Sequence, residues 1–340
     1  MKKIKIAVLC PSEIAFRRFM PALQKIGEIE YVGIAIANEM EWFGNIDPTR
    51  NLEILKQEKE KAEKFQETFG GKIFESYNDL LTSSDVDAVY IPLPPALHFK
   101  WAKFALEQNK HVFVEKPSTT SLKDLETLVE LAKEKGLALH ENYMFNFHSQ
   151  IDKIEELINN NEIGDVRLYR IAFGFPFRGS NDFRYNKKMG GGALLDCGGY
   201  TLKLATRLLK NNVRLVAHQL NYRDDFEVDI YGSGTLINDF GQVAQISFGM
   251  DNSYKCELEV WGAHGTIYTN RIFTAPCDYI PTITIIKNNE KIDISLDKDD
   301  SFKKSIQHFI RCLQDDTIRK ENYQNLLEQE KLLSEFMEDK

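Results

Sequence analysis

The stretch "DAVYIPLPPALHFKWAKFALEQNKHVFVEKP" (Asp87–Pro117) decides the class of fold. Two short apolar runs, each rich in β-branched and aromatic residues, flank a segment of helical periodicity at His98–Gln108. A strand, a helix and a second strand in that order indicate two parallel strands joined by a crossover helix. The second strand runs into Glu115, Lys116 and Pro117, which we expect at the carboxyl edge of the sheet, where open α/β sheets bind ligands.

The same alternation extends over the first 140 residues. Strand patterns occupy Ile4–Leu9 and Tyr31–Ala37, with a helix-period stretch between them. Leu52–Phe69 and Leu122–Lys135 are charged helical segments, each followed by glycine in the position that ends helices. We therefore predict an α/β N-terminal domain, residues 1–140, with the parallel sheet of a nucleotide-binding Rossmann fold.

The pattern changes after about residue 150. A helix at Ile151–Asn160 leads into several runs that alternate apolar and polar residues, with turn residues between them. This favours an α+β domain, residues 141–340, built on a large, mostly antiparallel open sheet. Two closing helices, Phe302–Leu313 and Glu321–Met337, are expected to pack back on the first domain. We expect the active site in the cleft between the domains.

Composition excludes several classes of function. Lysine and arginine number 43 against 51 acidic residues, a net charge of −8, so no basic field indicates nucleic acid or an acidic membrane. No run approaches the roughly 20 apolar residues of a membrane-spanning helix. The five cysteines are scattered without a CxxC pair, which favours a reducing cytoplasm and no zinc site. We expect a cytoplasmic protein without a metal.

Four stretches resemble, in order and spacing, the glucose-fructose oxidoreductase/inositol dehydrogenase (Gfo/Idh/MocA) family over essentially the whole chain. They are "EIAFRRFMPAL" (Glu13–Leu23), Ile91–Pro117, "MGGGALLDCGGY" (Met189–Tyr200) and "LEVWGAHGTIYTN" (Leu258–Asn270). The resemblance implies a hydride-transferring oxidoreductase with NAD or NADP. It also implies a homodimer or homotetramer, because family members commonly pair through the open face of the second sheet.

The resemblance assigns the chemistry to Lys116 and Tyr200. The family's EKP lysine lies beside the nicotinamide and substrate, where an ammonium group stabilises negative charge on the reacting oxygen. Tyr200 replaces the histidine common in the family, and Lys203 replaces a final aspartate. With a reference pKa near 10, tyrosine is suited to donating a proton, which favours ketone reduction over alcohol oxidation. The alternatives are a surface lysine and a packing tyrosine.

Tyrosine at this position resembles the branch of nucleotide-sugar 3-ketoreductases of deoxysugar biosynthesis. That branch implies a sugar site in which aromatic faces stack on rings while polar groups bind hydroxyls and phosphates. We place there Asn142, Tyr143, Phe145, His148, Arg184, Tyr185 and Asp196. Arg178, Arg184, Lys187 and Lys188 lie close together in sequence and would suit a diphosphate, although an ordinary solvated loop is an equal alternative.

The turn after the first strand has lost the glycines of the usual dinucleotide fingerprint. Cys10, Ser12 and Ala15 stand where glycines permit the tight turn, the approach to the pyrophosphate and close packing. Ser12 is suited to capping the helix, whose N-terminus attracts anions, so we expect cofactor binding to persist. The resemblance implies cofactor contacts from Cys10, Ser12, Glu13, Ile14, Arg17, Arg18, Asn38, Pro92, Leu93, His98, Glu115 and Lys116. On their own, His98 and His111 fit structural or surface roles better.

The choice between NAD and NADP stays open in the sequence. Glu39, after the second strand, favours NAD, because an acidic residue there binds the ribose hydroxyls. An unusual insertion, Met40–Arg50, follows it, and Arg50 could fold back toward a 2′-phosphate.

We therefore expect an NAD(P)H-dependent oxidoreductase that reduces a keto group of a nucleotide-linked (deoxy)sugar. One alternative is a dehydrogenase or reductase of a free sugar, polyol or cyclitol. The other is a non-catalytic sugar-binding or regulatory protein with a degenerate Rossmann domain.

Overall fold

The computed structural model describes residues 3–43 and 48–338, which form two compact units. The first unit runs up to Thr119 and adds Lys123–Asn142 and Ser305–Leu326. The second comprises Thr120–Leu122, Tyr143–Lys304 and the chain from Leu327 onward. The domain boundary after residue 140 stays a prediction.

The first unit is built on a six-stranded sheet in the order β3-β2-β1-β4-β5-β6, with all pairs parallel. This confirms the predicted Rossmann sheet. Its strands are β1 (Ile4–Val8), β2 (Ile29–Ala35), β3 (Lys72–Phe74), β4 (Ala88–Ile91), β5 (His111–Val114) and β6 (Leu139–Glu141). β4 and β5 are buried along most of their length, which explains their continuous apolar sequence.

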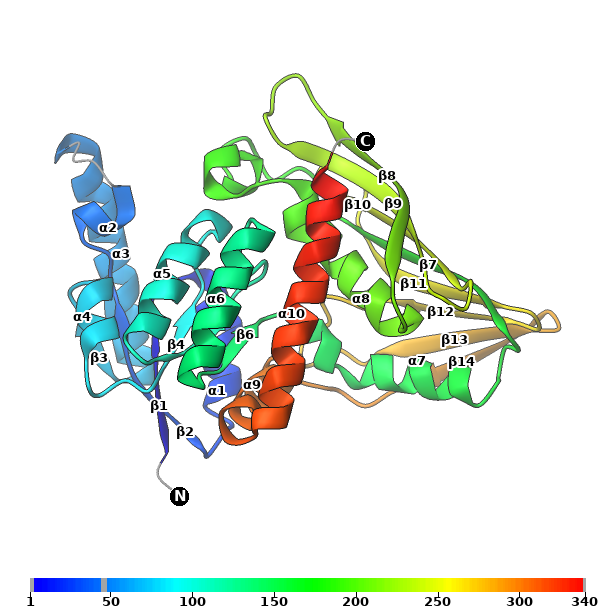
Figure 1. Cartoon of the computed structure of the whole chain (residues 1–340), viewed down its shortest axis with the longest axis horizontal. Coiled ribbons are helices and arrows are strands. Elements are labelled where there is room, and N and C mark those ends of the chain that lie inside the picture. The colour runs from blue at the N-terminus through cyan, green and yellow to red at the C-terminus, as the bar shows by residue number, and fades with distance from the viewer. Residues whose placement is uncertain (1–2, 44–47, 339–340) are drawn as a thin grey trace. The chain divides into compact units, whose positions relative to one another are not determined.

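The helices of this part alternate with the strands along the chain (Figure 1). They are a π-helical turn (Ala15–Phe19) with α1 (Met20–Leu23), α2 (Glu39–Phe43), α3 (Pro48–Phe69), α4 (Tyr77–Thr82), α5 (Pro95–Glu107) and α6 (Leu122–Lys135). The closing helices α9 (Ser301–Gln314) and α10 (Asp316–Met337) follow the last strand, and only their residues Ser305–Leu326 belong to the first unit. α5 begins three residues before the predicted start, because Pro95 is favourable at a first helical position. The predicted insertion Met40–Arg50 contains all of α2 except its first residue, Glu39, and the start of α3. Residues 44–47 and the Arg50 side chain lie outside the described part, so the expectation for Arg50 is not tested.

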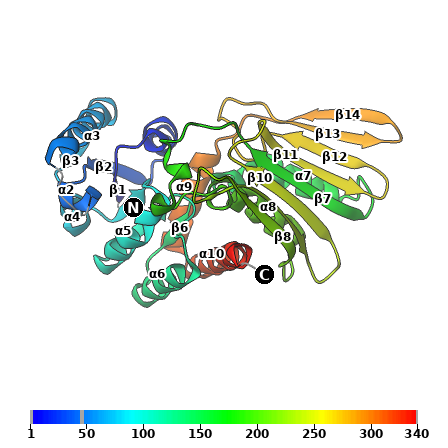
Figure 2. The same cartoon turned by 90° about the horizontal axis from the view of Figure 1, so that it is seen from above.

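The second unit carries an eight-stranded sheet in the order β14-β13-β12-β11-β7-β10-β9-β8, which Figure 2 shows as one continuous layer. Only β7 and β10 pair in parallel, so the predicted mostly antiparallel sheet is confirmed. The strands are β7 (Val166–Gly174), β8 (Arg214–Tyr222), β9 (Asp229–Ile237), β10 (Val243–Gly249), β11 (Lys255–Gly262), β12 (Thr266–Asn270), β13 (Thr282–Lys287) and β14 (Glu290–Ser295).

The two outermost strands of this sheet, β8 and β14, are not predicted by the alternation of apolar and polar residues. Most of their residues are exposed or only half-buried, so the alternation that reveals a strand with one buried face is missing. Helix α8 (Gly199–Leu209) packs against β7 and β10 in the middle of the sheet, and α7 (Ser149–Asn159) also belongs to this unit (Figure 1). In the described part of the chain, no helix is long and apolar enough to span a membrane.

Candidate active site

The carboxyl ends of the parallel strands gather most of the predicted cofactor residues at one edge of the first sheet. The strand order reverses between β1 and β4, and such a switch point opens a crevice outside the strand ends. The loops that leave this edge carry Cys10 and Ser12 after β1, Asn38 after β2, Pro92 and Leu93 after β4, Glu115 and Lys116 after β5, and Asn142 after β6.

The turn after β1 begins a helix without any glycine. The Ser12 hydroxyl accepts a hydrogen bond from the Ala15 amide at 3.2 Å, and the Ser12 carbonyl accepts one from Phe16 at 3.0 Å. Ser12 therefore caps the helix, the role that its side chain suits. Cys10 does not adopt a positive φ, so the turn does not need the conformational freedom of glycine there.

The Cys10 side chain points into the protein and not toward a ligand. It is 5% exposed, and its thiol donates to the carboxylate of Glu58 on α3, with Sγ and Oε2 3.8 Å apart. Burial, assisted by the Glu58 charge, raises the pKa of the Cys10 thiol far above its usual value.

The residues at this turn fit the pyrophosphate of a nicotinamide dinucleotide. The first intrahelical bond reaches Phe16, and helix geometry leaves the preceding amides of Glu13 and Ile14 without acceptors in the helix. Exposed Arg17 and half-buried Arg18 follow within one turn. Amide donors and nearby guanidinium groups are the chemistry that binds phosphates at helix N-termini.

Lys116 lies on a turn that contacts the buried side chain of His98 through the neighbouring residue Pro117. The Lys116–Pro117 peptide is cis. The ring of His98 is completely buried, with Nδ1 2.7 Å from the Pro117 carbonyl oxygen and Nε2 2.6 Å from that of Leu93. Burial lowers the pKa of His98 to about 4. His98, predicted as a cofactor contact, thus braces the loops after β4 and β5, in line with its structural alternative.

A buried polar network extends from Glu115 into α9. One carboxylate oxygen of Glu115 accepts from the Tyr90 hydroxyl at 2.6 Å and from the Asn142 amide at 2.7 Å. Burial raises the pKa of Glu115, and these two hydrogen bonds oppose the shift. The Asn142 carbonyl oxygen accepts from Ser305, which also contacts His140. The side-chain nitrogen and the side-chain oxygen of Asn142, a predicted sugar contact, therefore both have partners inside the protein.

In the second unit, Tyr200 lies in a cluster of aromatic rings and is 8% exposed. The ring centroids of Tyr143, Phe145, Phe173 and Phe273 lie 5.2–5.7 Å from its own. The structure thus brings three predicted site residues, Tyr143, Phe145 and Tyr200, together. Tyr143 and Phe145 are themselves only 2% and 1% exposed, so they pack inside this aromatic cluster.

The glycines around Tyr200 permit close contacts with its helix. A Cβ atom on Gly199 would lie 2.1 Å from the Tyr143 hydroxyl, and the Gly199 carbonyl accepts from the Gln329 side chain at 2.9 Å. A Cβ on Gly192 would lie 2.4 Å from the Asp229 carboxylate, which accepts from the Leu194 amide at 2.7 Å. Burial raises the pKa of Asp229 to about 6. These contacts position the segment that ends in Tyr200.

Arg184 is paired inside the protein. Its Nε donates to Asp196 at 2.8 Å, and another guanidinium nitrogen donates to Asp182 at 3.1 Å. Burial disfavours the charged guanidinium, but the two carboxylates hold its pKa above the usual value. The predicted residues Arg184 and Asp196 therefore meet each other, and the arginine charge is compensated.

The remaining predicted sugar residues have internal partners. The Tyr185 hydroxyl donates to the Met250 carbonyl at 2.7 Å, and His148 accepts from the Gln150 amide at 3.1 Å to cap α7. Burial lowers the pKa of His148. Among the neighbouring cations, Arg178, Lys187 and Lys188 are exposed. In the described part, no group of three or more histidine, cysteine, aspartate or glutamate residues could hold a metal ion.

The sequence patterns missed several residues that support this site. Asp229, Gln329, Ser305 and Glu58 are buried polar residues with partners far away in sequence. Of these, only Asp229 could have been noticed in the sequence, because it is an acid at the start of the alternating strand β9 (Asp229–Ile237). A carboxylate that is buried there requires hydrogen-bond partners.

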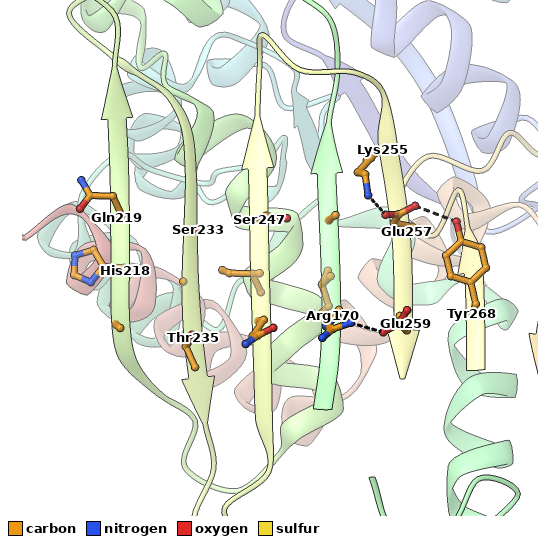
Figure 3. Close-up of a pocket in the computed structure, with 16 residues that line it drawn as sticks. Arg170, His218, Gln219, Ser233, Thr235, Ser247, Lys255, Glu257, Glu259 and Tyr268 are labelled. Carbon is orange, nitrogen blue, oxygen red and sulfur yellow. Dashed lines mark hydrogen bonds and ion pairs between the residues drawn. The ribbon is translucent and has the colours of Figure 1, made fainter. Parts of the chain in front are cut away.

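A separate hollow of about 720 Å³ lies on the face of the second sheet (Figure 3). Its lining includes two ion pairs, Arg170–Glu259 and Lys255–Glu257, and Tyr268 donates to Glu257 at 3.0 Å. Small polar residues of β9 and β10, such as Ser233 and Ser247, lie beside them. None of the predicted catalytic residues lines it, so it is not the candidate active site.

Comparisons with known proteins agree with this arrangement. Residues 30–143 match a family model described as "Oxidoreductase family, NAD-binding Rossmann fold", and residues 151–268 match the GFO/IDH/MocA C-terminal domain. The chain is 35% identical over 310 residues to dTDP-3,4-didehydro-2,6-dideoxy-α-D-glucose 3-reductase of Saccharopolyspora spinosa, covering 91% of this chain and 87% of that protein.

Solved structures extend the similarity to the whole fold. KijD10, a 3-ketoreductase from Actinomadura kijaniata solved with NADP and TDP-benzene, gives a TM-score of 0.88 at 34% identity, covering 98% of this chain and 96% of that one. Aldose-aldose oxidoreductase of Caulobacter crescentus shares the fold at 19% identity, with a TM-score of 0.81. On its sequence, its two sheets and these matches, the chain belongs to the Gfo/Idh/MocA oxidoreductase family.

Proposed function

We propose that this protein is an NAD(P)H-dependent reductase of a keto group on a nucleotide-linked (deoxy)sugar. The observation that carries the proposal is the 35% identity, over 91% of the chain, to a dTDP-keto-sugar 3-reductase. KijD10, similar over 98% of the chain, is described as a 3-ketoreductase in complex with NADP and TDP-benzene, a nucleotide-linked ligand. The turn at Ser12 and the Lys116 loop support this proposal.

Lys116 and Tyr200 divide the chemistry between them. When bound, the reduced nicotinamide supplies the hydride. Tyr200 donates a proton to the carbonyl oxygen, and the Lys116 ammonium stabilises the negative charge that develops on that oxygen. KijD10 has been solved with a lysine and a tyrosine replaced in turn, and those two positions are as far apart along its chain as Lys116 and Tyr200 are here.

The cofactor is held by the first unit's carboxyl edge. The amides of Glu13 and Ile14 bind the pyrophosphate, assisted by Arg17 and Arg18. The loops at Pro92–Leu93 and Glu115–Lys116 lie beside the nicotinamide half. The buried predicted residues Asn142, Tyr143, Phe145 and Tyr185 shape the sugar site by supporting its walls, whereas exposed Arg178, Lys187 and Lys188 offer charge to a diphosphate.

We further propose a cytoplasmic homodimer or homotetramer. All five cysteines are free, as expected in a reducing compartment. The hollow face of the second sheet presents strands β7 to β12 with small side chains and internally paired charges, a surface suited to a second copy of the chain.

The direct test is turnover of a dTDP-linked 3-keto sugar with NADH and NADPH, followed by loss of nicotinamide absorbance and by mass spectrometry of the product. Free sugars, polyols and cyclitols with the oxidised cofactors form the comparison set. Reduction of the nucleotide sugar alone supports the proposal, whereas preferential turnover of a free sugar overturns its substrate class. Absence of binding of either reduced cofactor would favour the non-catalytic alternative.

A further inference from the structure

The insertion after β2 places a carboxylate where the cofactor's adenosine ribose is expected. β2 ends at Ala35, and the Asn38 amide donates to Glu41 Oε2 at 3.0 Å, while the Glu41 amide donates to Asn38 Oδ1 at 2.9 Å. This reciprocal pair is a capping box that starts α2. The side-chain oxygen and the backbone amide of Asn38, a predicted cofactor contact, therefore both form hydrogen bonds with Glu41.

The same carboxylate reaches across to the next strand's loop. β2 and β3 pair in parallel, with Ala35 opposite Phe74, so both strands end at one edge. Glu41 Oε2 accepts from the Tyr77 amide at 3.0 Å, and Oε1 accepts from the Asn78 amide at 2.9 Å. The backbone amides of Asn38, Tyr77 and Asn78, beside the end of β2, therefore already donate to the Glu41 carboxylate.

A second carboxylate, Glu58, adds negative charge to the same side of the sheet. It is 5% exposed and contacts Cys10 in the turn after β1, with Lys61 3.0 Å away. Tyr77 contacts Glu41 through its backbone amide at 3.0 Å. Burial, followed by Cys10 and then by the charges of Glu58 and Glu41, raises the pKa of the Tyr77 hydroxyl. Two acidic side chains, one compensated by a lysine, therefore flank the loops that end β1, β2 and β3.

Dinucleotide folds separate NAD from NADP at this place. An acidic side chain after β2 suits the ribose hydroxyls of NAD, whereas a 2′-phosphate requires a cation and free donors. We propose that this protein selects NAD(H) over NADP(H) and that Glu41 is the specificity-determining residue. The inference rests on the proposed function and adds to it, since KijD10 is described with NADP. Glu41 excludes the 2′-phosphate by repulsion and by occupying the amides of Asn38, Tyr77 and Asn78.

The test is a fluorescence titration of the full-length protein with NADH and with NADPH. We expect NADH to bind at least about tenfold more tightly, the ratio that one carboxylate–phosphate repulsion near a protein surface produces. Glu41→Gln should reduce this ratio to about twofold, mainly by tightening NADPH. Glu67→Gln, at an exposed acid on α3, is the matched control and should leave the ratio unchanged. Glu39→Gln tests separately the acid that the sequence favoured for NAD.

Each outcome decides the matter. NADPH binding as tight as NADH in the wild-type protein overturns the inference but not the proposed function, and binding of neither overturns both. A change in Glu39→Gln alone removes the role from Glu41. If Glu41→Gln does not fold, a salt series on the wild-type protein decides, because screening should shrink the preference for NADH. A preference that salt leaves constant overturns the assignment.

Discussion

The Pro117 carbonyl oxygen lies 2.7 Å from Nδ1 of His98, and the other ring nitrogen of His98 lies 2.6 Å from the Leu93 carbonyl. One buried ring therefore links the loop after β4 to the loop that carries Lys116. The catalytic lysine that we propose is positioned by a side chain eighteen residues earlier in the chain, on a different element. Several consequences of such buried contacts can be measured.

Replacing His98 by alanine should lower the free energy of unfolding by about 1–3 kcal/mol, because the ring with its lowered pKa is neutral and its single N–H is lost as the donor to one of the two buried carbonyl groups. Turnover should fall as well, since the Lys116 loop loses its support. Urea denaturation and steady-state kinetics measure the two effects. His264→Ala, at an exposed histidine, is the control. A stability loss no larger than that of the control would contradict the bracing role.

Lys116→Ala and Tyr200→Phe should each lower turnover of the keto sugar by about 10²–10⁴-fold, the range for loss of charge stabilisation or of a general acid. Affinity for the reduced cofactor, measured by fluorescence titration, should change little. Lys203→Ala is the control, because Lys203 lies on α8 together with Tyr200. A comparable loss of turnover in this variant would show that the effect of Tyr200→Phe is not specific to Tyr200. Wild-type rates in either site variant would remove that residue from the mechanism.

Gly199→Ala should destabilise the protein by about 1–3 kcal/mol and reduce turnover, because the new Cβ lies 2.1 Å from the Tyr143 hydroxyl. Adding Tyr143→Phe removes that oxygen and should restore part of the stability. Thermal denaturation of the single and double variants gives the coupling. Gly27→Ala, where no atom lies within 4 Å of the added Cβ, should be nearly neutral. Additive effects of the two changes would show that this contact is not the cause.

Acidification should destabilise the fold through His111. Burial, followed by the Arg319 charge, lowers the pKa of His111 to about 4, and its Nδ1 accepts from the Ala138 amide at 2.9 Å. Between pH 6.5 and 4 the unfolded chain binds a proton that the folded chain does not, so unfolding becomes easier as the pH falls. His111→Asn should remove on the order of 2 kcal/mol of this pH dependence. Parallel stability curves for the two proteins from pH 7 to 4 would contradict this.

Ser247→Arg should weaken self-association, because the new side chain places a bulky charge on the hollow face of the second sheet. Sedimentation velocity at several protein concentrations measures the change. Lys56→Ala, on exposed α3, serves as the surface control. An unchanged oligomer in Ser247→Arg would direct the search for the interface to another surface.

Most of the fold was accessible from periodicity. β4, β5 and the helix between them follow from Asp87–Pro117, and α6 matches its predicted bounds. β8 and β14 were missed because edge strands exposed on both faces lack alternation.

The candidate site was accessible only in part. Motif spacing predicts Lys116 and Tyr200 as site residues, because their types and positions carry the resemblance. The resemblance also predicts Arg184 and Tyr185 at the ligand, and these stay predictions. The structure adds that Arg184 pairs with Asp196 and that the Tyr185 hydroxyl donates to Met250. A sequence shows which side chains can form hydrogen bonds, but not whether protein groups already satisfy them.

The sequence by itself determined two sheet types and the family, because these depend on local periodicity and on motifs, and it predicts Lys116 and Tyr200 as the residues suited to ketone reduction. Tertiary structure alone decided how the glycine-free turn works. Ser12 caps the helix, and Cys10 points away to Glu58, 48 residues distant. It also decided that Glu41 meets Tyr77 and Asn78. Such partners depend on which distant segments the fold brings together, and burial then fixes their energy.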